Sequence, residues 1–364
     1  MYKQDLPGGR TLSMTRKDVI AGLAGCLVAP ALDGCRATAA GQGGTGEIRA
    51  MLHHLGWNMW SDCPVKYWGR YKTEAELSRV CAADRVRTDE DVWKRVSERM
   101  VQSGCNMIVI DLGEACFYPS HPELAVEGTW SVDKIRAELA RLRKMGLEPI
   151  PKLNFSTGHD TWLKDYGRMV STDEYYRVCS DVIADVCEIF DSPRFLHLGY
   201  DEETLEQQRQ YAYATVRTGE LWWHDMLWFI RQVENRSVRA WIWSDRMWHD
   251  ESYLTRMPKS VLQSNWYYDQ KFNLGEKPPE GCVRAYLDSF IDLDKAGFDQ
   301  VPCGSNWAYD SNFGGLVDFS KANISPERLK GFLMAPWFFP DALEEAKLMR
   351  GCDLAAQAWG NSKE

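Results

Sequence analysis

The sequence predicts a (β/α)₈ barrel, and two observations carry this prediction. Short apolar runs rich in β-forming residues recur eight times beyond residue 47, and a helical pattern or a loop separates each run from the next. Eight strands joined by crossover helices in one chain of 364 residues are typical of this barrel. Apolar residues make up 45% of the chain, which is enough for a substantial core and excludes disorder over most of its length.

The eight runs define the expected strands, and the patterns between them define the helices. We expect strands at residues 51–57, 106–112, 147–154, 194–200, 239–244, 261–266, 300–305 and 332–337. We expect helices at residues 90–102, 131–145, 172–190, 219–235 and 340–358. Ser131 and Thr172 offer N-cap hydroxyls to the second and third of these helices, and Gly146 is typical of a helix end. The fifth and sixth crossovers have the weakest helical patterns, so we expect irregular segments there.

The first 35 residues have the features of an export signal. Two basic residues, Arg16 and Lys17, precede an apolar run from 19 to 32, which is too short to span a bilayer as a stable helix. Residues 14–20 resemble a twin-arginine signal in which lysine takes the second basic position. The sequence Ala-Leu-Asp-Gly-Cys that ends at Cys35 is similar to a bacterial lipobox, which would make Cys35 the lipid-anchored first residue.

This pattern divides the chain into three expected parts. We expect an export signal at residues 1–35, a flexible glycine-rich tether at 36–47 and a catalytic barrel at 48–364. The expected location is the periplasm or the cell surface, with or without a lipid anchor. A second lipobox match that ends at Cys26, and a buried N-terminal helix in place of a signal, are the alternatives.

Charge and cysteine content exclude some classes of partner and site. Asp and Glu number 52 against 43 Lys and Arg, a net charge of −9, whereas nucleic acids and anionic membranes need a basic partner surface. Two of the 11 cysteines lie in the expected signal; the others are scattered and have no CxxC spacing, which argues against a zinc site or a disulfide scaffold. His53 and His54 lack the spacing of a metal site. We therefore expect no metal and no organic cofactor.

In a barrel of this kind the reactive groups lie where the strands end. Carboxylates are concentrated at the ends of the second to fifth expected strands, at Asp111, Glu114, Asp201, Glu202 and Asp245. Tryptophans follow the last three strands, at Trp266, Trp307 and Trp337. Indole faces stack on sugar rings, so a rim that is half acidic and half aromatic suits a neutral, polyhydroxylated substrate. The expected partner is a carbohydrate.

Two motifs resemble glycoside hydrolase family 20, the β-N-acetylhexosaminidases. Gly-Leu-Glu-Pro-Ile-Pro at residues 146–151, followed by Gly158-His159, is similar to the family's G-I-E-x-I-P…G-H. His-Leu-Gly-Tyr-Asp-Glu at residues 197–202 resembles the family's most specific motif, H-x-G-G-D-E. The resemblance implies a barrel hydrolase that removes terminal N-acetylhexosamine by substrate-assisted, retaining catalysis.

The resemblance also implies a role for each matching residue. Glu202 would protonate the glycosidic oxygen, and Asp201 would orient the substrate's 2-acetamido group, whose carbonyl oxygen attacks the anomeric carbon. His159 and His197 would hold the hydrogen bonds around this pair, and Arg49 would bind sugar hydroxyls. The other expected substrate contacts are Asp111, Glu114, Asp245, Trp266, Trp307, Tyr309, Asp310 and Trp337.

Adjacent residues on a regular strand face opposite sides, so Asp201 and Glu202 can share a cavity only if the backbone leaves the strand there. The chain also departs from the family pattern near this pair. Tyr200 replaces a glycine, and Lys152 and Asn154 stand on the third strand where the family has acids. On the eighth strand, aromatic residues 338 and 339 follow Trp337 where the family has an acid.

These departures leave two alternatives open. One is a barrel glycosidase with a direct carboxylate nucleophile, Asp245 or Asp310, acting on a sugar without an acetamido group. The other is a catalytically inactive, glycan-binding lipoprotein on the same fold.

Overall fold

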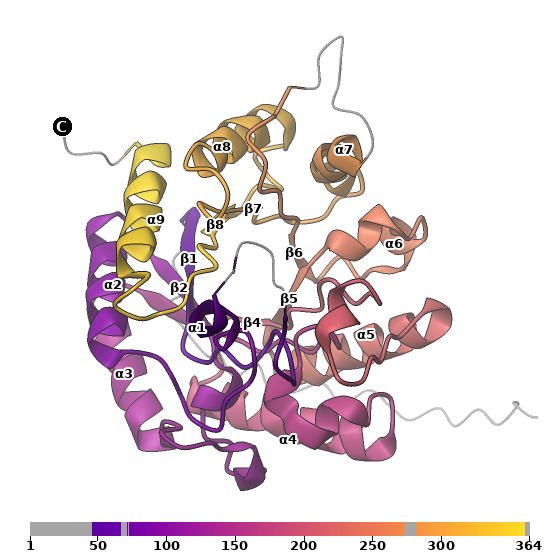
Figure 1. Ribbon diagram of the computed structural model, residues 1–364. Helices are drawn as coiled ribbons and strands as arrows, with labels where there is room; N and C mark the ends of the chain where they lie inside the picture. The colour runs from indigo at the N-terminus through magenta and orange to yellow at the C-terminus, as the bar shows by residue number, and fades with distance from the viewer. Residues whose placement is uncertain (1–45, 67–70, 72, 274–281, 361–364) are drawn as a thin grey trace, which may run out of the picture. The chain divides into compact units, whose positions relative to one another are not determined.

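The computed structural model describes residues 46–66, 71, 73–273 and 282–360, and in this part of the chain eight parallel strands form a barrel (Figure 1). The strands are β1 Ile48–His54, β2 Met107–Asp111, β3 Glu148–Lys152, β4 Phe195–His197, β5 Arg239–Trp243, β6 Leu262–Ser264, β7 Cys303–Gly304 and β8 Gly331–Met334. The predicted export signal, including Cys35, lies outside the described residues. The same holds for residues 36–45 of the predicted tether.

The order of the strands closes the sheet on itself. Hydrogen bonds join them in the order β6-β5-β4-β3-β2-β1-β8-β7. Single parallel bridges from Gln263 to Gln300 and from Trp266 to Cys303 link the two ends of this series. The prediction of a (β/α)₈ barrel is therefore confirmed.

Strand β1 begins and ends three residues before the predicted run. The backbone N–H groups of Trp57 and Asn58 donate to the Glu114 carboxylate, at 2.8 and 2.9 Å, and not to a neighbouring strand. The local apolar pattern continues to Trp57, but this distant carboxylate ends the pairing earlier. At its other end β1 begins where Ile48 pairs with Gly331 of β8, so Arg49 lies inside the strand, near its first residue.

Helices follow the strands and surround the barrel (Figure 1). The α-helices are α1 Glu74–Leu77, α2 Glu90–Gln102, α3 Val132–Lys144, α4 Asp173–Ile189, α5 Gly219–Glu234, α6 Tyr253–Arg256, α7 Cys282–Lys295, α8 Asn312–Asn323 and α9 Glu345–Ala358. The short 3₁₀ helices are η1 Gly113–Ala115, η2 Pro122–Leu124, η3 Thr161–Arg168, η4 Gln207–Gln210 and η5 Asp245–Trp248. Ser131 and Thr172 cap α3 and α4 as predicted, because each hydroxyl accepts a backbone N–H in the first turn. Gly146, with a φ of +89°, follows the end of α3.

The expectation for the fifth and sixth crossovers was half right. The fifth contains only η5 and the four-residue α6, and is irregular as predicted. The sixth contains the 14-residue helix α7, whose buried Leu287, Phe290 and Leu293 recur every three residues. Helix α8 was not predicted, because Gly314 and Gly315 lower its helix propensity. A Cβ at Gly315 would lie 2.5 Å from the Phe272 ring, so close packing requires this glycine.

Alternate residues of each strand fill the inside of the barrel. Most of the interior is apolar, as at Ala50, Val109, Ile150 and Leu333. At the carboxyl ends of β1 to β4 the interior becomes polar, and we call this set the interior polar layer: His54, Asp111, Lys152 and His197. This layer forms the floor below the loops that carry the site.

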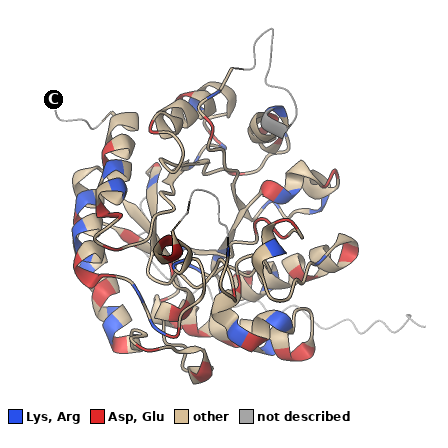
Figure 2. Cartoon of the chain, viewed as in Figure 1, with Lys and Arg blue, Asp and Glu red and all other residues tan. Residues whose placement is uncertain are grey.

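Basic and acidic residues both occur along the outer helices (Figure 2). None of the helices in the described part of the chain is long and apolar enough to cross a membrane. The side chains with the potential for chemistry lie at the ends of the strands.

Candidate active site

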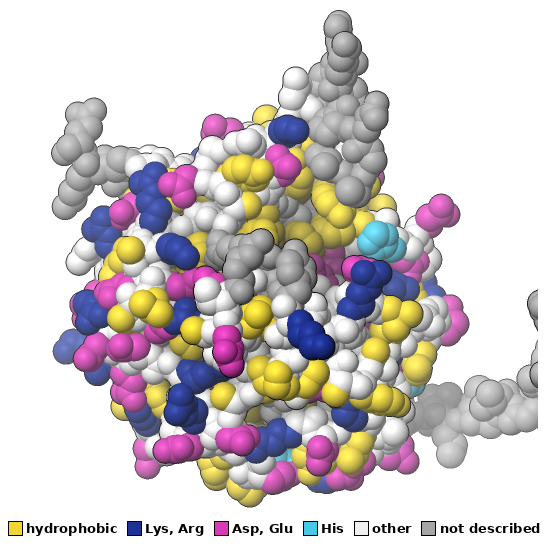
Figure 3. Space-filling model, in the orientation of Figure 1, with side chains coloured by type: hydrophobic (Ala, Val, Ile, Leu, Met, Phe, Trp, Pro, Cys, Tyr) yellow, Lys and Arg dark blue, Asp and Glu magenta, His cyan; other side chains and the backbone are white. Residues whose placement is uncertain are grey.

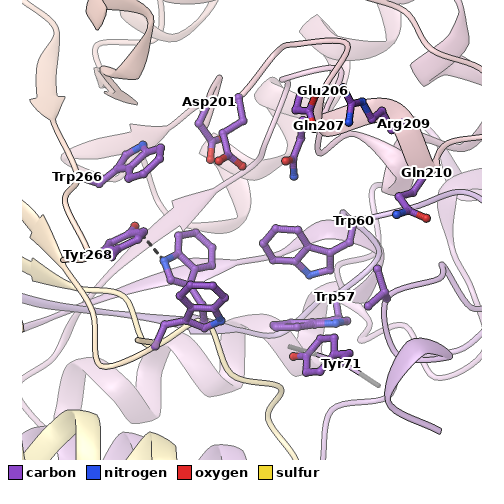
Figure 4. A pocket seen from close by; sticks show the side chains of 14 residues that line it. Trp57, Trp60, Tyr71, Asp201, Glu206, Gln207, Arg209, Gln210, Trp266 and Tyr268 are labelled. Carbon is purple, nitrogen blue, oxygen red and sulfur yellow. Dashed lines mark hydrogen bonds and ion pairs between the residues drawn. The ribbon is translucent and has the colours of Figure 1, made fainter. Parts of the chain in front are cut away.

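A cavity of about 540 Å³ opens at the carboxyl end of the barrel. Its described lining comes from the loops after β1, β4, β6, β7 and β8, and most of it is aromatic or polar. The lining residues are Trp57, Trp60, Tyr71, Val80, Asp201, Glu202, Glu206, Gln207, Arg209, Gln210, Trp266, Tyr268, Trp307 and Trp337 (Figure 4). In the space-filling view, hydrophobic side chains gather near the centre of the barrel face (Figure 3).

A left-handed turn directs both carboxylates of the pair into this cavity. Strand β4 ends at His197, and Gly199, Tyr200 and Glu202 then take φ values of +66°, +75° and +51°. Residues other than glycine rarely adopt this region, so surrounding contacts must hold it. The turn breaks the strand alternation, as the sequence required, and Asp201 and Glu202 both line the cavity.

Tyr200 does not enter the cavity. Its ring is buried against Trp222 and Phe229, with centroid distances of 5.4 and 5.6 Å, and the Arg217 guanidinium lies 4.5 Å from it. The bulky residue that replaces the family's glycine is therefore accommodated in the layer between strands and helices.

Side chains from the two neighbouring strands hold this turn. From the end of β3, Asn154 donates from Nδ2 to Asp201 Oδ1 at 2.8 Å, and its Oδ1 accepts the Tyr200 N–H at 3.0 Å. From the end of β5, Asp245 Oδ2 accepts the Glu202 N–H at 2.9 Å. The strained backbone is thus fixed by one amide and one carboxyl group, both buried.

His159 lies between the two carboxylates. Its Nε2 is 3.3 Å from Glu202 Oε2 and 3.6 Å from Asp201 Oδ2. Burial alone would lower the pKa of His159, but the charges of Asp201 and Glu202 outweigh burial and raise it. The two carboxylates therefore favour the protonated imidazole.

Asp245 adds a third carboxyl group to the site. Burial, reinforced by the nearby charge of Asp201, raises the pKa of Asp245 to about 8. Its carboxyl group is therefore mostly protonated at neutral pH. It acts as a neutral hydrogen-bonding group there.

The described residues also contain one group with the donors for a metal ion. One nitrogen of His159 and one oxygen each of Asp201 and Glu202 lie within 4.8 Å of one another. Imidazole and carboxylate are donors that Zn²⁺ accepts. The sequence predicts no metal, and these same atoms are already engaged with one another in the arrangement described above.

Aromatic rings form the walls of the cavity (Figure 4). Trp266 and Tyr268 stack with centroids 5.1 Å apart, and the Tyr268 hydroxyl accepts the Trp337 Nε1–H at 2.9 Å. On the other side, Trp60 lies edge-on to Trp57 at 5.7 Å and to His159 at 5.2 Å. Flat, rigid walls above charged groups suit a ring with one apolar face and several hydroxyls.

Seven of the predicted site residues meet at or beside this cavity. They are His159, Asp201, Glu202, Asp245, Trp266, Trp307 and Trp337. Trp307 forms the rim, with 41% of its surface exposed.

Three other predicted residues lie below the cavity and support it. Asp111 and His197 belong to the interior polar layer. Burial would raise the pKa of Asp111, but Lys152, whose Nζ is 2.6 Å from Oδ2, lowers it to about 2. His197 Nδ1 accepts the Gly199 N–H at 3.0 Å and so supports the turn after β4. Burial lowers the pKa of His197, which favours the neutral imidazole. Glu114 holds the loop that carries Trp57.

The structure does not bring Arg49, Tyr309 or Asp310 to the cavity. Arg49 lies at the amino end of β1, the opposite end of the barrel, and its Nε is 3.9 Å from Glu47. A residue at the start of a strand lies at the opposite end of the barrel from the cavity, which is at the carboxyl ends of the strands. Tyr309 is 41% exposed outside the lining, and Asp310 forms an ion pair with Arg350 at 2.8 Å.

The sequence-based site missed several aromatic side chains. Trp57, Trp60 and Tyr71 come from the loop after β1, and Tyr268 comes from the segment after β6. Tyr268 could have been found from alternation, because it stands two residues after Trp266 and faces the same side. The β1 loop has no regular pattern, so only the cluster of aromatic residues after the strand marks it.

No protein-family model and no curated protein matches this chain by sequence. Solved structures do match. One is an exo-β-N-acetylglucosaminidase of glycoside hydrolase family 20 from Vibrio harveyi, with 14% identity, a TM-score of 0.53, and coverage of 85% of this chain and 54% of that one. A chitobiase from Flavobacterium johnsoniae has 16% identity and a TM-score of 0.55, and the match covers 75% of this chain and 46% of that one.

A β-N-acetylhexosaminidase from Bacteroides fragilis gives 13% identity, a TM-score of 0.54, and coverage of 86% of this chain and 65% of that one. The chain thus spans about half to two thirds of the length of these three proteins. At such low identity the likeness shows the barrel fold.

Proposed function

We propose that this protein is a glycoside hydrolase that removes terminal N-acetylhexosamine residues by substrate-assisted, retaining catalysis. One observation carries the proposal: Asp201 and Glu202 reach the same aromatic cavity from a left-handed turn at the end of β4. The solved structures that share the fold support it, since they are described as β-N-acetylhexosaminidases, a chitobiase and an exo-β-N-acetylglucosaminidase.

Cleavage of a glycoside needs a proton for the leaving oxygen and electron density at the anomeric carbon. Glu202 supplies the proton, because its side chain is 37% exposed and therefore reaches the open part of the cavity. The substrate's own acetamido oxygen attacks the anomeric carbon. Asp201, which is 7% exposed, accepts the acetamido N–H and stabilises the positive charge that develops on that group. His159 Nε2 faces both carboxylates from the side and stabilises their negative charge.

The structural features argue against a direct carboxylate nucleophile. Asp310 is tied to Arg350 outside the cavity. Asp245 has a pKa raised to about 8, and its Oδ2 already accepts the Glu202 N–H. A protonated and engaged carboxyl group is a poor nucleophile at neutral pH.

Neither substitution that favoured an inactive glycan-binding protein blocks the cavity. Tyr200 points toward the helices. Phe339 packs against Trp57 at 5.1 Å, and the guanidinium groups of Arg79 and Arg87 lie 5.3 and 5.5 Å from its ring. The altered residues therefore leave room for one sugar ring beside the pair.

A panel of aryl glycosides with and without the 2-acetamido group tests the proposal. We expect release of the aryl alcohol only from the N-acetylhexosaminides. Glu202→Gln should lower kcat about 10²–10⁴-fold, the usual contribution of a general acid. Turnover of sugars without the acetamido group, or sugar binding by calorimetry without any turnover, would contradict it.

We also propose that residues 1–35 direct export and that Cys35 receives a lipid. The expected result is a membrane-associated, exported protein that Cys35→Ser releases in soluble form, measured by fractionation and immunoblotting. Full-length protein that stays in the cytoplasm would exclude the export proposal.

A further inference from the structure

We infer that Asn154 is the positioning residue that keeps Asp201 as a hydrogen-bond acceptor and so leaves Glu202 to act as the acid. The inference rests on the proposed function and concerns a position at which the chain departs from the family pattern. Its basis is the set of hydrogen bonds that Asn154 makes at the end of β3.

The orientation of the Asn154 amide is fixed by its neighbours. Its Oδ1 lies 3.0 Å from the backbone nitrogen of Tyr200 and 3.0 Å from that of Ser156. Backbone N–H groups can only donate, so the amide oxygen and not the NH₂ group must face them. The NH₂ group then points to Asp201, where Nδ2 is 2.8 Å from Oδ1.

An NH₂ group has no lone pair to offer, so Asp201 Oδ1 must accept and carries no proton. The other oxygen, Oδ2, faces His159 Nε2 at 3.6 Å. Asn154 is therefore a donor to this carboxylate, His159 Nε2 faces its other oxygen, and Asp201 is only 7% exposed to water. Oδ2 remains able to accept a donor from a substrate, which the acetamido N–H provides.

The turn fits around Asn154 closely. Gly199 has a φ of +66°, and a Cβ there would lie 2.2 Å from Asn154 Oδ1. The same amide thus shapes the backbone before the pair and sets the hydrogen-bonding state of its first member. A carboxylate at position 154 could accept the same two N–H groups but could not donate to Asp201 unless it took up a proton.

Asn154→Asp separates these two tasks. Two facing carboxyl groups would share a proton, and one of them would hold it to higher pH. We expect kcat on an aryl N-acetylhexosaminide to fall about 10²-fold at pH 7. The acid limb of the kcat/KM profile should move upward by about one pH unit or more.

Asn312→Asp is the matched control. Asn312 is equally buried, its Oδ1 accepts the Ser305 N–H at 2.9 Å, and its Nδ2 donates to the Tyr267 carbonyl at 2.9 Å. This variant should lose stability and leave the acid limb in place. If both variants lose the same activity and the acid limb moves in neither, Asn154 has only a structural role and the inference is overturned.

A reciprocal exchange tests the contact without a substrate. In Asn154→Asp combined with Asp201→Asn, residue 201 donates and residue 154 accepts. We expect the unfolding midpoint of Asn154→Asp at pH 7 to be lower than that of the unmodified protein, and the double variant to regain most of the loss without regaining activity. A double variant no more stable than Asn154→Asp would overturn the inference. Failure of the unmodified protein on every N-acetylhexosaminide would instead reject the proposed function, and the stability exchange would still report on the contact.

Discussion

The protonation of Asp245 is coupled to the fold. Its carboxyl group is 8% exposed, it anchors the Glu202 N–H, and its pKa is raised from 3.8 to about 8. The folded protein therefore holds a proton that the unfolded chain releases at much lower pH. Stability contributed by this proton is lost as the pH rises from about 4 to about 8.

Asp245→Asn should remove this dependence. Asparagine still offers an oxygen to the Glu202 N–H, but it cannot ionise. We expect the variant to gain in unfolding temperature relative to the unmodified protein as the pH rises from 4 to 8, and the difference to level off above the folded-state pKa of about 8. Calorimetric scans at several pH values measure this. Asp310→Asn, at an exposed ion pair, is the control, and equal, pH-independent differences for both variants would contradict the prediction.

At the scale of elements, the loop after β1 depends on one carboxylate for its position. Glu114 on η1 accepts the N–H groups of Trp57 and Asn58, and a Cβ at Gly56 would lie 2.4 Å from the Leu112 carbonyl oxygen. This loop supplies Trp57 and Trp60 to the cavity. The aromatic wall on this side is therefore set by a contact between the ends of β1 and β2, and not by the loop's own sequence.

The close approach of β8 to β1 at Gly331 leads to a prediction about stability. Gly331 pairs with Ile48, has a φ of +140°, and a Cβ there would lie 2.0 Å from the Ile48 carbonyl oxygen. Neither backbone can move without opening the barrel. We expect Gly331→Ala to cost more than about 3 kcal/mol of unfolding free energy.

Gly146→Ala is the control for this prediction, since Gly146 has a φ of +89° but a Cβ added there would have no other atom within 4 Å. It should cost about 1–2 kcal/mol, the effect of a left-handed residue alone. Urea unfolding followed by circular dichroism measures both. Equal costs would show that the close approach to Ile48 is relieved easily.

At the scale of the whole molecule, the strands of the barrel are not paired equally well, and we call the β6–β7 junction, where the two ends of the strand series meet, the seam. Strands β1 and β2 pair over five consecutive residues, whereas the β6–β7 junction has two isolated bridges, at Gln263 and Trp266, with four backbone hydrogen bonds between residues 263–267 and 299–303. Fewer consecutive backbone bonds mean that local opening costs less there. The cavity wall after β6 stands directly above this seam.

Native-state amide hydrogen exchange tests whether the β6–β7 junction opens more readily than the β1–β2 pair. The amides of Val301 and Cys303 donate to Gln263 and Asn265 across the seam, at 2.9 Å each. We expect them to exchange at least about tenfold faster than the amides of β1 and β2. Uniform protection around the barrel would contradict this prediction.

The fold could be predicted from the sequence because the β-rich runs and the amphipathic helices are local patterns. The pairing of Asp201 with Glu202 in one cavity could be anticipated from their place at a strand end. The position of Arg49 could not, because β1 starts where it pairs with β8, and Ile48 and Gly331 are 283 residues apart in the sequence. The contact of Asn154 with Asp201 was hidden for a similar reason, since it depends on how the turn after β4 meets the end of β3.

The turn after β4 has an evolutionary consequence. Its backbone is held through the N–H groups of Tyr200 and Glu202, which bind Asn154 and Asp245 and do not need the Glu202 carboxylate. One base change that converts the acid to glutamine would therefore silence the chemistry while the scaffold survives. The proposed activity could therefore be lost in one step without loss of the fold.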